Sequence, residues 1–176
     1  MDHREDLVAE RACIITRLRW HLHELDPAWT PPGMLELASA YDRVEQHLAQ
    51  FDRLVGRLAT NLVGHCRRLT TEIAELTAEI SERVEQVAPS LPAVAGCGAL
   101  TAAKIIGETA GADRFRSKDA FARHNGTAPL PVRPSNRARH RLSRTGNRQL
   151  NAALHRIAIT QARCRPAGTI SQAQGW

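Results

Sequence analysis

The sequence predicts an all-α protein, in which a long helical coiled-coil arm is followed by a compact helical domain that contains a helix-hairpin-helix. Three observations predict this fold. Apolar residues recur every three or four positions through the first half, a Gly-x-Gly turn then precedes a new helix, and a further apolar helical stripe follows near the end. We expect 1–90 to be the helical coiled-coil region, 91–165 the helix-hairpin-helix domain and 166–176 a tail.

The first apolar stripe predicts a helix that ends at Asp26-Pro27. Its members are Val8, Ile15, Leu18, Leu22 and Leu25, interrupted only by Arg11. Prolines then follow in close succession, and because proline lacks a backbone donor and disfavours helix in the residue before it, a loop is expected. This short stripe fits packing on a neighbouring helix of the same domain as well as it fits a coiled coil.

A second stripe begins at Tyr41 and predicts one helical arm over residues 41–87. Its members are Val44, Leu48, Phe51, Val55, Leu58 and Leu62, and after a one-residue slip near Gly64, Leu69, Ile73, Leu76, Ile80, Val84 and Val87. At 1.5 Å per residue such a helix is about 70 Å long, more than the rest of the chain can cover. We therefore expect an antiparallel or intermolecular coiled coil, and homo-oligomers formed through it.

Charge divides the chain into two unlike parts. Residues 1–90 hold 10 Lys and Arg against 15 Asp and Glu, whereas residues 91–176 hold 14 against 3, so the net charge of +6 conceals an acidic half and a strongly basic half. Most cations of the basic half are arginines, which bind phosphate and guanine in a bidentate way. The asymmetry favours a nucleic acid as partner.

Composition argues against several other classes. Aromatic residues make up only 4% of the chain, which disfavours a large aromatic-packed enzyme core. No apolar run approaches the roughly 20 residues that span a bilayer, and the charged N-terminus lacks the apolar region of a signal peptide. The four cysteines form no C-x-x-C pair, so we expect a reduced, cytoplasmic protein with no metal ligands and no membrane partner.

The basic region opens with a glycine turn before a helix. Gly96 and Gly98 permit positive φ and close approach of the backbone, and the N–H groups at the start of the next helix would point at a phosphate. Small residues such as Ala102 would let two helices cross tightly. With Thr101 and Lys104 in the first turns, the pattern has the form of a helix-hairpin-helix that binds the nucleic-acid backbone without reading sequence. A purely structural turn is the alternative.

Local signals divide the rest of the basic region. Ser117 or Asp119 is suited to cap a short helix. His124-Asn125-Gly126 has the composition of a turn, and a second turn is expected at Gly146-Asn147. One apolar helical face follows, formed by Leu150, Ala153, Leu154, Ile157 and Ala158.

An arginine-rich segment supplies the remaining predicted contacts to nucleic acid. Five arginines lie within residues 137–148 with no acidic residue among them, and they would repel one another unless an anion lay between them. The predicted binding residues are Arg133, Arg137, Arg139, Arg141, Arg144, Asn147, Arg148 and Asn151.

Two long segments of the basic region carry a family resemblance. They are Phe115-Arg-Ser-Lys-Asp-Ala-Phe-Ala-Arg-His-Asn-Gly-Thr-Ala-Pro129 and Arg141-Leu-Ser-Arg-Thr-Gly-Asn-Arg-Gln-Leu-Asn-Ala-Ala-Leu-His-Arg-Ile-Ala158. Together they resemble the C-terminal domain of the DEDD-type insertion-sequence transposases, the bridge-RNA-guided serine recombinases of bacterial mobile elements, over about residues 91–163. The resemblance implies a helical DNA-binding and recombination domain that works in an oligomer on element ends and target DNA. It also raises a guide RNA as a partner.

One departure from the family concerns a whole domain. In the family a RuvC-like nuclease domain with metal-binding carboxylates precedes the coiled coil, and this chain begins after that point. We therefore expect a truncated derivative that holds no cofactor itself, with Mg²⁺ needed only by the missing domain.

A second departure concerns the catalytic serine, which the family places in a Ser-Gly pair in the loop after Ala-Pro, where it attacks a DNA phosphodiester. Ser135 is the one serine of that loop and is the candidate nucleophile. Counting back without gaps from Ser143 instead puts Pro134 at the family's serine position. Either the loop is shifted by one residue or the nucleophile has been lost. His124 and His140 are candidate bases through proximity alone.

Three functions stay open on the sequence. The first is a DNA transposition and recombination protein of an insertion sequence that binds DNA through its basic domain; serine-dependent strand exchange would be its chemistry, and this chain would not be autonomous. The second is a non-catalytic nucleic-acid-binding derivative that forms mixed oligomers with an intact transposase. The third is a structural coiled-coil protein. We expect the first, in truncated form.

Overall fold

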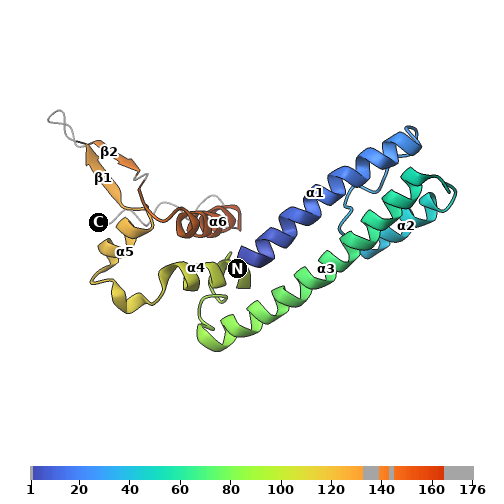
Figure 1. Cartoon of the computed structure of the whole chain (residues 1–176). Helices are drawn as coiled ribbons and strands as arrows, with labels where there is room; N and C mark the ends of the chain where they lie inside the picture. The colour runs from blue at the N-terminus through green and yellow to red at the C-terminus, as the bar shows by residue number, and fades with distance from the viewer. Residues whose placement is uncertain (1, 133–138, 143–144, 165–176) are drawn as a thin grey trace. The chain divides into compact units, whose positions relative to one another are not determined.

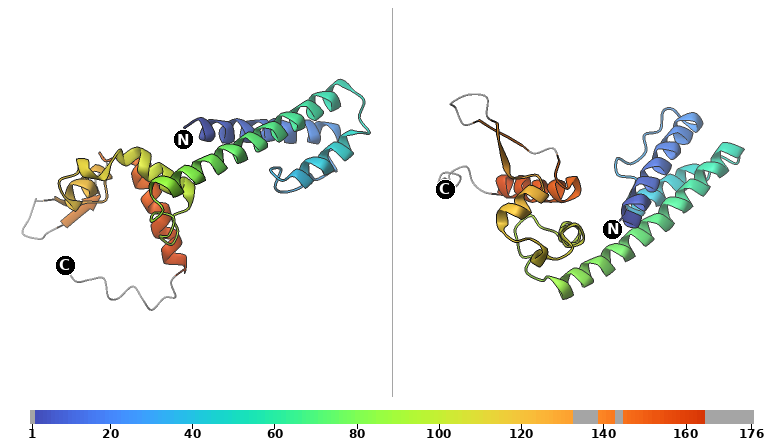
Figure 2. Two further views of the ribbon diagram at one scale, coloured as in Figure 1. Left: turned by 90° about the horizontal axis from the view of Figure 1, so that it is seen from below. Right: turned by 60° about the vertical axis from the view of Figure 1, so that its left-hand side comes forward.

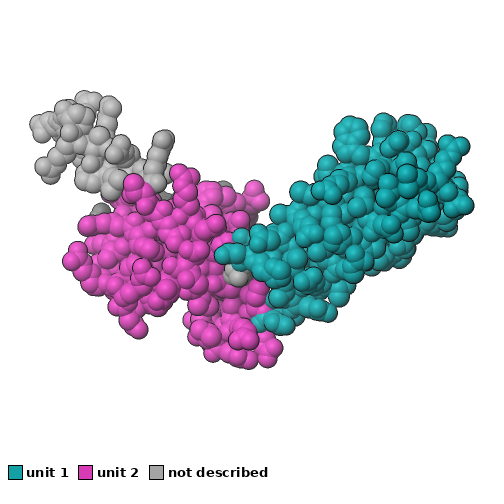
Figure 3. Space-filling model, viewed as in Figure 1, with its two compact units in different colours: residues 1–79 teal, residues 80–176 magenta. Residues whose placement is uncertain are grey.

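A computed structural model gives the fold (Figure 1) and describes residues 2–132, 139–142 and 145–164. For residues 130–132 and 139–142 it describes the backbone alone. Helices dominate, so the predicted all-α class is confirmed, although a short two-stranded hairpin joins them. The chain separates into two compact units, Met1–Glu79 and Ile80–Trp176, which Figure 3 colours teal and magenta. We call them unit 1 and unit 2 and describe each by itself.

Unit 1 is built from α1 (Asp2–Leu25), α2 (Ala38–Leu48) and most of α3 (Leu54–Val87). Helices α1 and α3 lie side by side in Figures 1 and 2. They are antiparallel, because Arg4 near the start of α1 donates to Thr77 Oγ1 at 2.8 Å and Arg11 donates to Thr70 Oγ1 at 3.2 Å. Later residues of α1 thus meet earlier residues of α3.

The buried face of α1 confirms part of the predicted stripe. Leu18 and Leu22 are buried as expected, whereas Val8, Ile15 and Leu25 are only partly buried. The fully buried positions near the start of the helix are Leu7 and Ile14, one residue earlier than the stripe we expected. This face packs on helices of its own unit, which was one of the two interpretations that the sequence left open.

The predicted continuous helix over residues 41–87 is wrong. Helix α2 ends at Leu48 and α3 begins at Leu54, with a turn between them in which the Phe51 N–H donates to Leu48 O at 2.9 Å. The start of α3 folds back closely on this turn, and a Cβ at Gly56 would collide with the Phe51 carbonyl oxygen. The apolar spacing continues through residues 49–53 although the backbone turns there, so spacing alone did not reveal the break.

The break also moves the buried face of α3. Leu58, predicted as a core residue, is 43% exposed. Ala59, Val63 and Cys66 are buried in its place, so small side chains bring α3 close to its neighbours. From Leu69 onward the predicted stripe and the buried face coincide again, with the exception of Val87, which is exposed.

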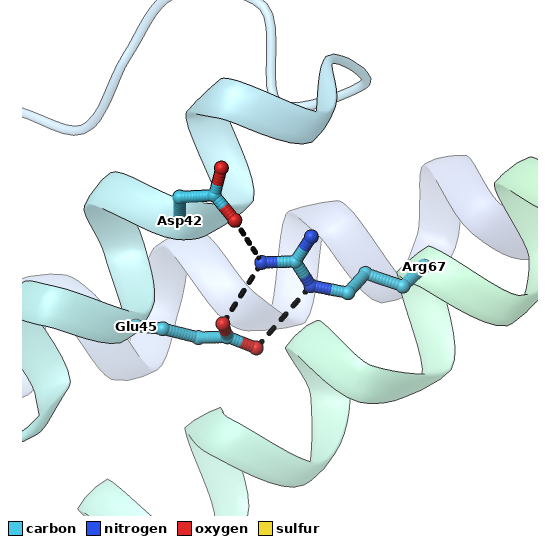
Figure 4. Close-up of polar contacts among 3 residues, drawn as sticks. All are labelled: Asp42, Glu45 and Arg67. Atoms are coloured by element: carbon cyan, nitrogen blue, oxygen red, sulfur yellow. Dashed lines mark hydrogen bonds and ion pairs between the residues drawn. The ribbon is translucent and has the colours of Figure 1, made fainter.

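An ion-pair network joins α2 to α3 (Figure 4). The Arg67 Nη2 atom lies 2.6 Å from Asp42 Oδ1 and 2.8 Å from Glu45 Oε2, and Nε donates to Glu45 Oε1 at 3.3 Å. Hydrogen bonds to Glu45, and then to Asp42, raise the pKa of Arg67 above its ordinary value. The guanidinium also lies 5.5 Å from the centre of the Tyr41 ring, so this arginine ties the two helices together.

Unit 2 contains the last turns of α3, then α4 (Ala99–Thr109), a short 3-10 helix η1 (Ala112–Arg114), α5 (Lys118–His124), strands β1 (Pro129–Val132) and β2 (Arg139–Leu142), and α6 (Arg148–Cys164). Helix α4 packs against α6. Ala102 on α4 and Ala153 on α6 are both buried, in agreement with the expectation that small residues let two helices cross tightly. Val84 and Cys97 belong to the same core as Ala102.

Several local predictions in unit 2 are confirmed. The Ser117 side chain caps α5 by accepting the Ala120 N–H at 3.2 Å. A turn follows α5, with Gly126 at a φ of 76°. On α6, Leu150 is buried as expected, but Ala158 is exposed and is not part of the apolar face.

The hairpin of β1 and β2 was not predicted, because we expected a loop there. Its strands are antiparallel, with Pro129 opposite Leu142 and Pro131 opposite His140. Prolines usually interrupt a strand since they cannot donate to the ladder. Here they are two residues apart and therefore occupy equivalent positions in the alternating pattern of antiparallel hydrogen bonds, which a two-stranded ribbon tolerates.

Three further properties bear on the function classes. No described helix is long and apolar enough to cross a membrane. Within the described ranges, no group of three or more His, Cys, Asp or Glu side chains is placed to hold a metal ion. All four cysteines are free; Cys13 and Cys164 are exposed, whereas Cys66 and Cys97 are buried, and burial raises the pKa of both buried thiols.

Candidate nucleic-acid interface

The glycine turn before α4 is docked on α6. Gly96 has a φ of 83°, and a Cβ there would lie 2.9 Å from Thr160 Cβ, so only glycine fits this approach. The Gln161 side chain donates to the Ala95 carbonyl oxygen at 2.9 Å on the same side. The structure thus gives Gly96 a packing role.

The second glycine of the turn has a different place. Gly98 is the N-cap residue of α4, with no side chain to occupy the end of the helix and nothing within 4 Å of a Cβ built on it. Of the polar residues predicted beside it, Thr101 is half-buried and Lys104 is buried at 6% exposure. Contact with a phosphate stays a prediction for these four residues, and the burial of Lys104 sets it apart from the surface cations. The helix-hairpin-helix likewise stays a prediction. Residues 89–96, just before α4, form turns and a bend and contain no separate first helix.

The two ends of the hairpin meet at a pair of glycines. A Cβ on Gly146 would lie 2.6 Å from the Cα of Gly126, so the backbone at Gly126 leaves no room for a side chain at position 146. Beside them, Asn125 is buried and its Oδ1 accepts the N–H of Thr127 at 2.9 Å and the Thr127 hydroxyl at 2.7 Å. The Asn125 carbonyl oxygen accepts from the Asn151 side chain at 2.9 Å.

Asn147 completes this arrangement with three hydrogen bonds. Its backbone N–H donates to His124 O at 2.7 Å, and its side-chain Nδ2 donates to Glu108 Oε2 at 2.6 Å. Its Oδ1 accepts the Leu150 N–H at 3.0 Å and so caps the start of α6. We call Glu108, Asn125, Asn147 and Asn151 the asparagine clamp; it ties α4, the turn after α5 and the start of α6 together where the hairpin emerges.

The clamp gives two predicted binding residues an internal role. The side-chain amides of Asn147 and Asn151 both donate within the protein, to Glu108 and to the Asn125 carbonyl. Contacts from these residues to nucleic acid remain a prediction. Sequence reasoning assigned no role to Glu108 and gave Asn125 only a place in a turn, since each pairs with a residue more than twenty positions away.

The described arginines of unit 2 lie on its surface. Arg148 is exposed, as are several cations that we did not single out, namely Arg114, Arg116, Lys118, Arg123, Arg156 and Arg163. In the part of the chain that the structure describes, none of these seven side chains forms an ion pair. Arg114 donates a hydrogen bond to Thr109 O at 3.3 Å and lies 5.1 Å from the centre of the Phe115 ring.

The remaining predicted residues lie in or near the hairpin. Arg139 and Arg141 are in β2, where the backbone alone is described. The other predicted residues of this segment lie outside the described residues, and they are Arg133, Pro134, Ser135, Arg137 and Arg144. Of the two candidate bases, His124 is half-buried with its ring 5.1 Å from that of Phe115, and its Nε2 has no hydrogen-bond partner among the described residues.

Comparison with known proteins found one family model that matches this part of the chain. Residues 88–171 match the model of the transposase IS116/IS110/IS902 family. No curated protein and no solved structure matches the chain. The matched segment lies within unit 2 and contains the glycine turn, the asparagine clamp and the hairpin. Unit 2 therefore carries a segment similar to the insertion-sequence transposases of the IS116/IS110/IS902 family.

Proposed function

We propose that this protein acts in DNA transposition and recombination of an insertion sequence, and that unit 2 binds the DNA. The observation that carries the proposal is the family match over residues 88–171. The surface chemistry of the same unit supports it, because seven exposed cations there have no ion-pair partner among the described residues. Uncompensated arginines attract a polyanion and release its counterions on binding.

The proposal has finer parts that rest on the resemblance found in the sequence. Ser135 would act as the nucleophile of strand exchange, with its hydroxyl oxygen attacking a DNA phosphorus and the leaving hydroxyl of the broken strand taking the proton. In the sequence Ser135 falls between β1 and β2, and the glycines that flank these strands, Gly126 and Gly146, meet beside the asparagine clamp. Work in the cytoplasm, assembly into homo-oligomers and a guide RNA as a further partner belong to the same proposal.

Covalent trapping tests the chemistry. The wild type, Ser135→Ala and Ser143→Ala are incubated with element-end DNA, Mg²⁺ and a separately supplied RuvC-like domain, and the products are separated on a denaturing gel. Ser143→Ala is the matched control, since it removes a nearby serine of the same arginine-rich segment. We expect a protein–DNA adduct with the wild type and Ser143→Ala, and none with Ser135→Ala.

Other outcomes divide the proposal into its parts. An adduct that survives in Ser135→Ala would exclude this serine as the nucleophile. Binding to DNA without any adduct would leave a non-catalytic nucleic-acid-binding protein, able to act through mixed oligomers with an intact transposase. A protein that neither binds nor cleaves DNA would contradict the proposed function as a whole.

A further inference from the structure

Helix α6 has two unlike faces. Leu150 and Ala153 are buried, and Leu154, Ile157 and Gln161 beside them are half-buried. At 100° per residue these positions form one side of the helix. The opposite side is exposed along the whole helix, and we call it the outer face of α6. Its residues are Arg148, Ala152, His155, Arg156, Ile159, Ala162 and Arg163.

The outer face is basic. It carries three arginines and a histidine, and the whole of α6 contains no acidic residue. Alanines at positions 152 and 162 lie between the arginines, on either side of the larger His155, Arg156 and Ile159. At these two positions another molecule can approach the helix backbone closely. From Arg148 to Arg163 the helix rises about 22 Å, at 1.5 Å per residue.

Contacts on the flanks of α6 hold it in place without using this face. Near its start, Asn151 donates to the Asn125 carbonyl oxygen, and near its end Gln161 donates to the Ala95 carbonyl oxygen, each at 2.9 Å. Asn147 caps the first turn. Both ends of the helix are thus fixed to unit 2, which presents the outer face as a rigid surface.

We propose that the outer face of α6 lies in the major groove of duplex DNA, with Arg148, Arg156 and Arg163 on the phosphates that border the groove. This inference rests on the proposed DNA binding of unit 2. The major groove of B-form DNA is about 12 Å wide and admits a helix. A rise of about 22 Å corresponds to roughly six base pairs at 3.4 Å each, so arginines at both ends of the helix reach the two bordering strands.

The shape of the major groove favours DNA over RNA as the duplex. The major groove of an A-form RNA helix is deep and narrow, and side chains do not read it. Because that groove is too narrow for a helix, α6 cannot enter it. In the wider major groove of DNA, Ala152, Ile159 and Ala162 on the outer face suit close contact with thymine methyl groups. We therefore expect duplex RNA of the same sequence to bind more weakly than duplex DNA.

The first test removes the three arginines and compares equal losses of charge. The variant R148A/R156A/R163A is measured against R17A/R57A/R68A, which removes three exposed arginines of unit 1. Binding to a short fluorescent DNA duplex is followed by anisotropy across a range of salt concentrations. Since each lost phosphate contact removes about 0.9 from the slope of log K against log salt, the α6 variant should lose about 2.7 in slope and on the order of 100-fold in affinity at 0.1 M salt.

The control variant should bind within about twofold of the wild type, because the inference places no phosphate contact on these three arginines. Circular dichroism of both variants checks that they fold. A second variant, R148K/R156K/R163K, keeps the charges and should keep the slope. Equal losses in the α6 variant and the control would overturn the inference, since net charge alone would then explain binding.

The second test asks which groove is used. Ala152→Trp places a large ring on the outer face, between Arg148 and Arg156, without touching the buried side, and we expect DNA binding to fall about tenfold. A ligand that fills the minor groove should not compete, and methylation of guanine N7 in the major groove should weaken binding. Competition by the minor-groove ligand, or tighter binding to duplex RNA, would overturn the inference.

The outcomes also separate this inference from the proposed function. If the wild type binds DNA and the α6 variant binds as well as the control, the inference fails and the proposed function stands. If the wild type does not bind DNA at any salt concentration, the proposed DNA binding fails and the inference fails with it.

Discussion

The arginines of unit 1 and those of unit 2 are used in different ways. In unit 1, Arg4 and Arg11 donate to threonines of the neighbouring helix, and Arg67 pairs with Asp42 and Glu45. Arg11 and Arg67 form ion pairs with carboxylates of the same unit. In unit 2 the exposed arginines have no such partners within the described ranges, although the unit is far more basic.

This difference shows why a charge count alone does not identify a binding surface. An arginine that already pairs with two carboxylates must give up those contacts before it can bind a phosphate, and it contributes to internal stability. An exposed arginine without a partner loses nothing of this kind when it meets a polyanion. The contrast can be tested by substitutions, ordered here from the largest expected effect to the smallest.

The largest effect should come from the apolar core that supports the paired arginines of unit 1. Leu18 is 0% exposed, so Leu18→Ala leaves a cavity and should lower the free energy of unfolding by about 3 kcal/mol. Leu58→Ala, at a position that the apolar spacing assigned to the core but the structure exposes, should cost less than about 1 kcal/mol. Denaturant unfolding followed by tryptophan fluorescence measures both. If both variants lose the same free energy of unfolding, Leu58 must be as buried as Leu18, which would contradict the exposed position of Leu58 on α3.

The asparagine clamp should give the next largest effect, in unit 2. Asn147→Ala removes the cap of α6 and the hydrogen bond to Glu108, and it should cost about 1–2 kcal/mol of stability. Asn147→Ser keeps an oxygen that can cap the helix and should recover part of this loss. The melting temperatures of the two variants, compared with that of the wild type, test these expected losses of stability. Unchanged stability with weakened DNA binding would instead make Asn147 a direct contact to nucleic acid.

A paired and an unpaired arginine of the same helix give the sharpest comparison within unit 1. Arg67→Met breaks the network with Asp42 and Glu45 and should cost about 1 kcal/mol, since the side chain is partly exposed and screened. Arg68→Met, at the next residue, removes an exposed arginine and should change stability by less than about 0.5 kcal/mol. The difference should shrink in high salt. A difference that does not respond to salt would mean that Arg67 acts through packing.

The buried thiol of unit 1 should give the smallest effect, as a pH dependence. Burial raises the pKa of Cys66 above its ordinary value of 9.0. Because the pKa is higher in the folded state than in the unfolded chain, the stabilising contribution is complete below pH 9 and is lost as the pH rises through the folded-state pKa. Unfolding by urea at increasing pH should show this loss in the wild type and less of it in Cys66→Ala. A thiol reagent should modify Cys13 before Cys66 in the native protein, and equal rates would contradict the burial of Cys66.

The sequence predicts those parts of the fold that depend on near neighbours. The cap at Ser117, the turn at Gly126 and the buried positions of α2 follow from residue type and spacing over one or two turns. The break between α2 and α3 does not, because the apolar spacing continues across it while the backbone of Gly56 approaches Phe51. The hairpin is hidden for a related reason, since its prolines are the residues that argue against a strand.

For the candidate site too, the sequence predicts the part that depends on local composition and misses the part that depends on contacts between distant residues. The many arginines and few acidic residues of positions 91–176 are enough to indicate a surface for a polyanion. Which polar residues serve the fold cannot be read from the sequence, because the Glu108–Asn147 and Asn125–Asn151 contacts join residues 39 and 26 positions apart. The sequence alone did not single out Arg156 and Arg163 as binding residues. Their place on the outer face of α6 becomes clear only after the structure shows which side of the helix is buried.

The most direct test of the central claim is the salt dependence of duplex DNA binding by the unmodified protein. If the unpartnered cations of unit 2 bind phosphates, log K should fall linearly with log salt with a slope steeper than about −3, as expected when several phosphates are neutralised. A slope near zero, or no binding at low salt, would contradict the claim that these arginines form a nucleic-acid interface.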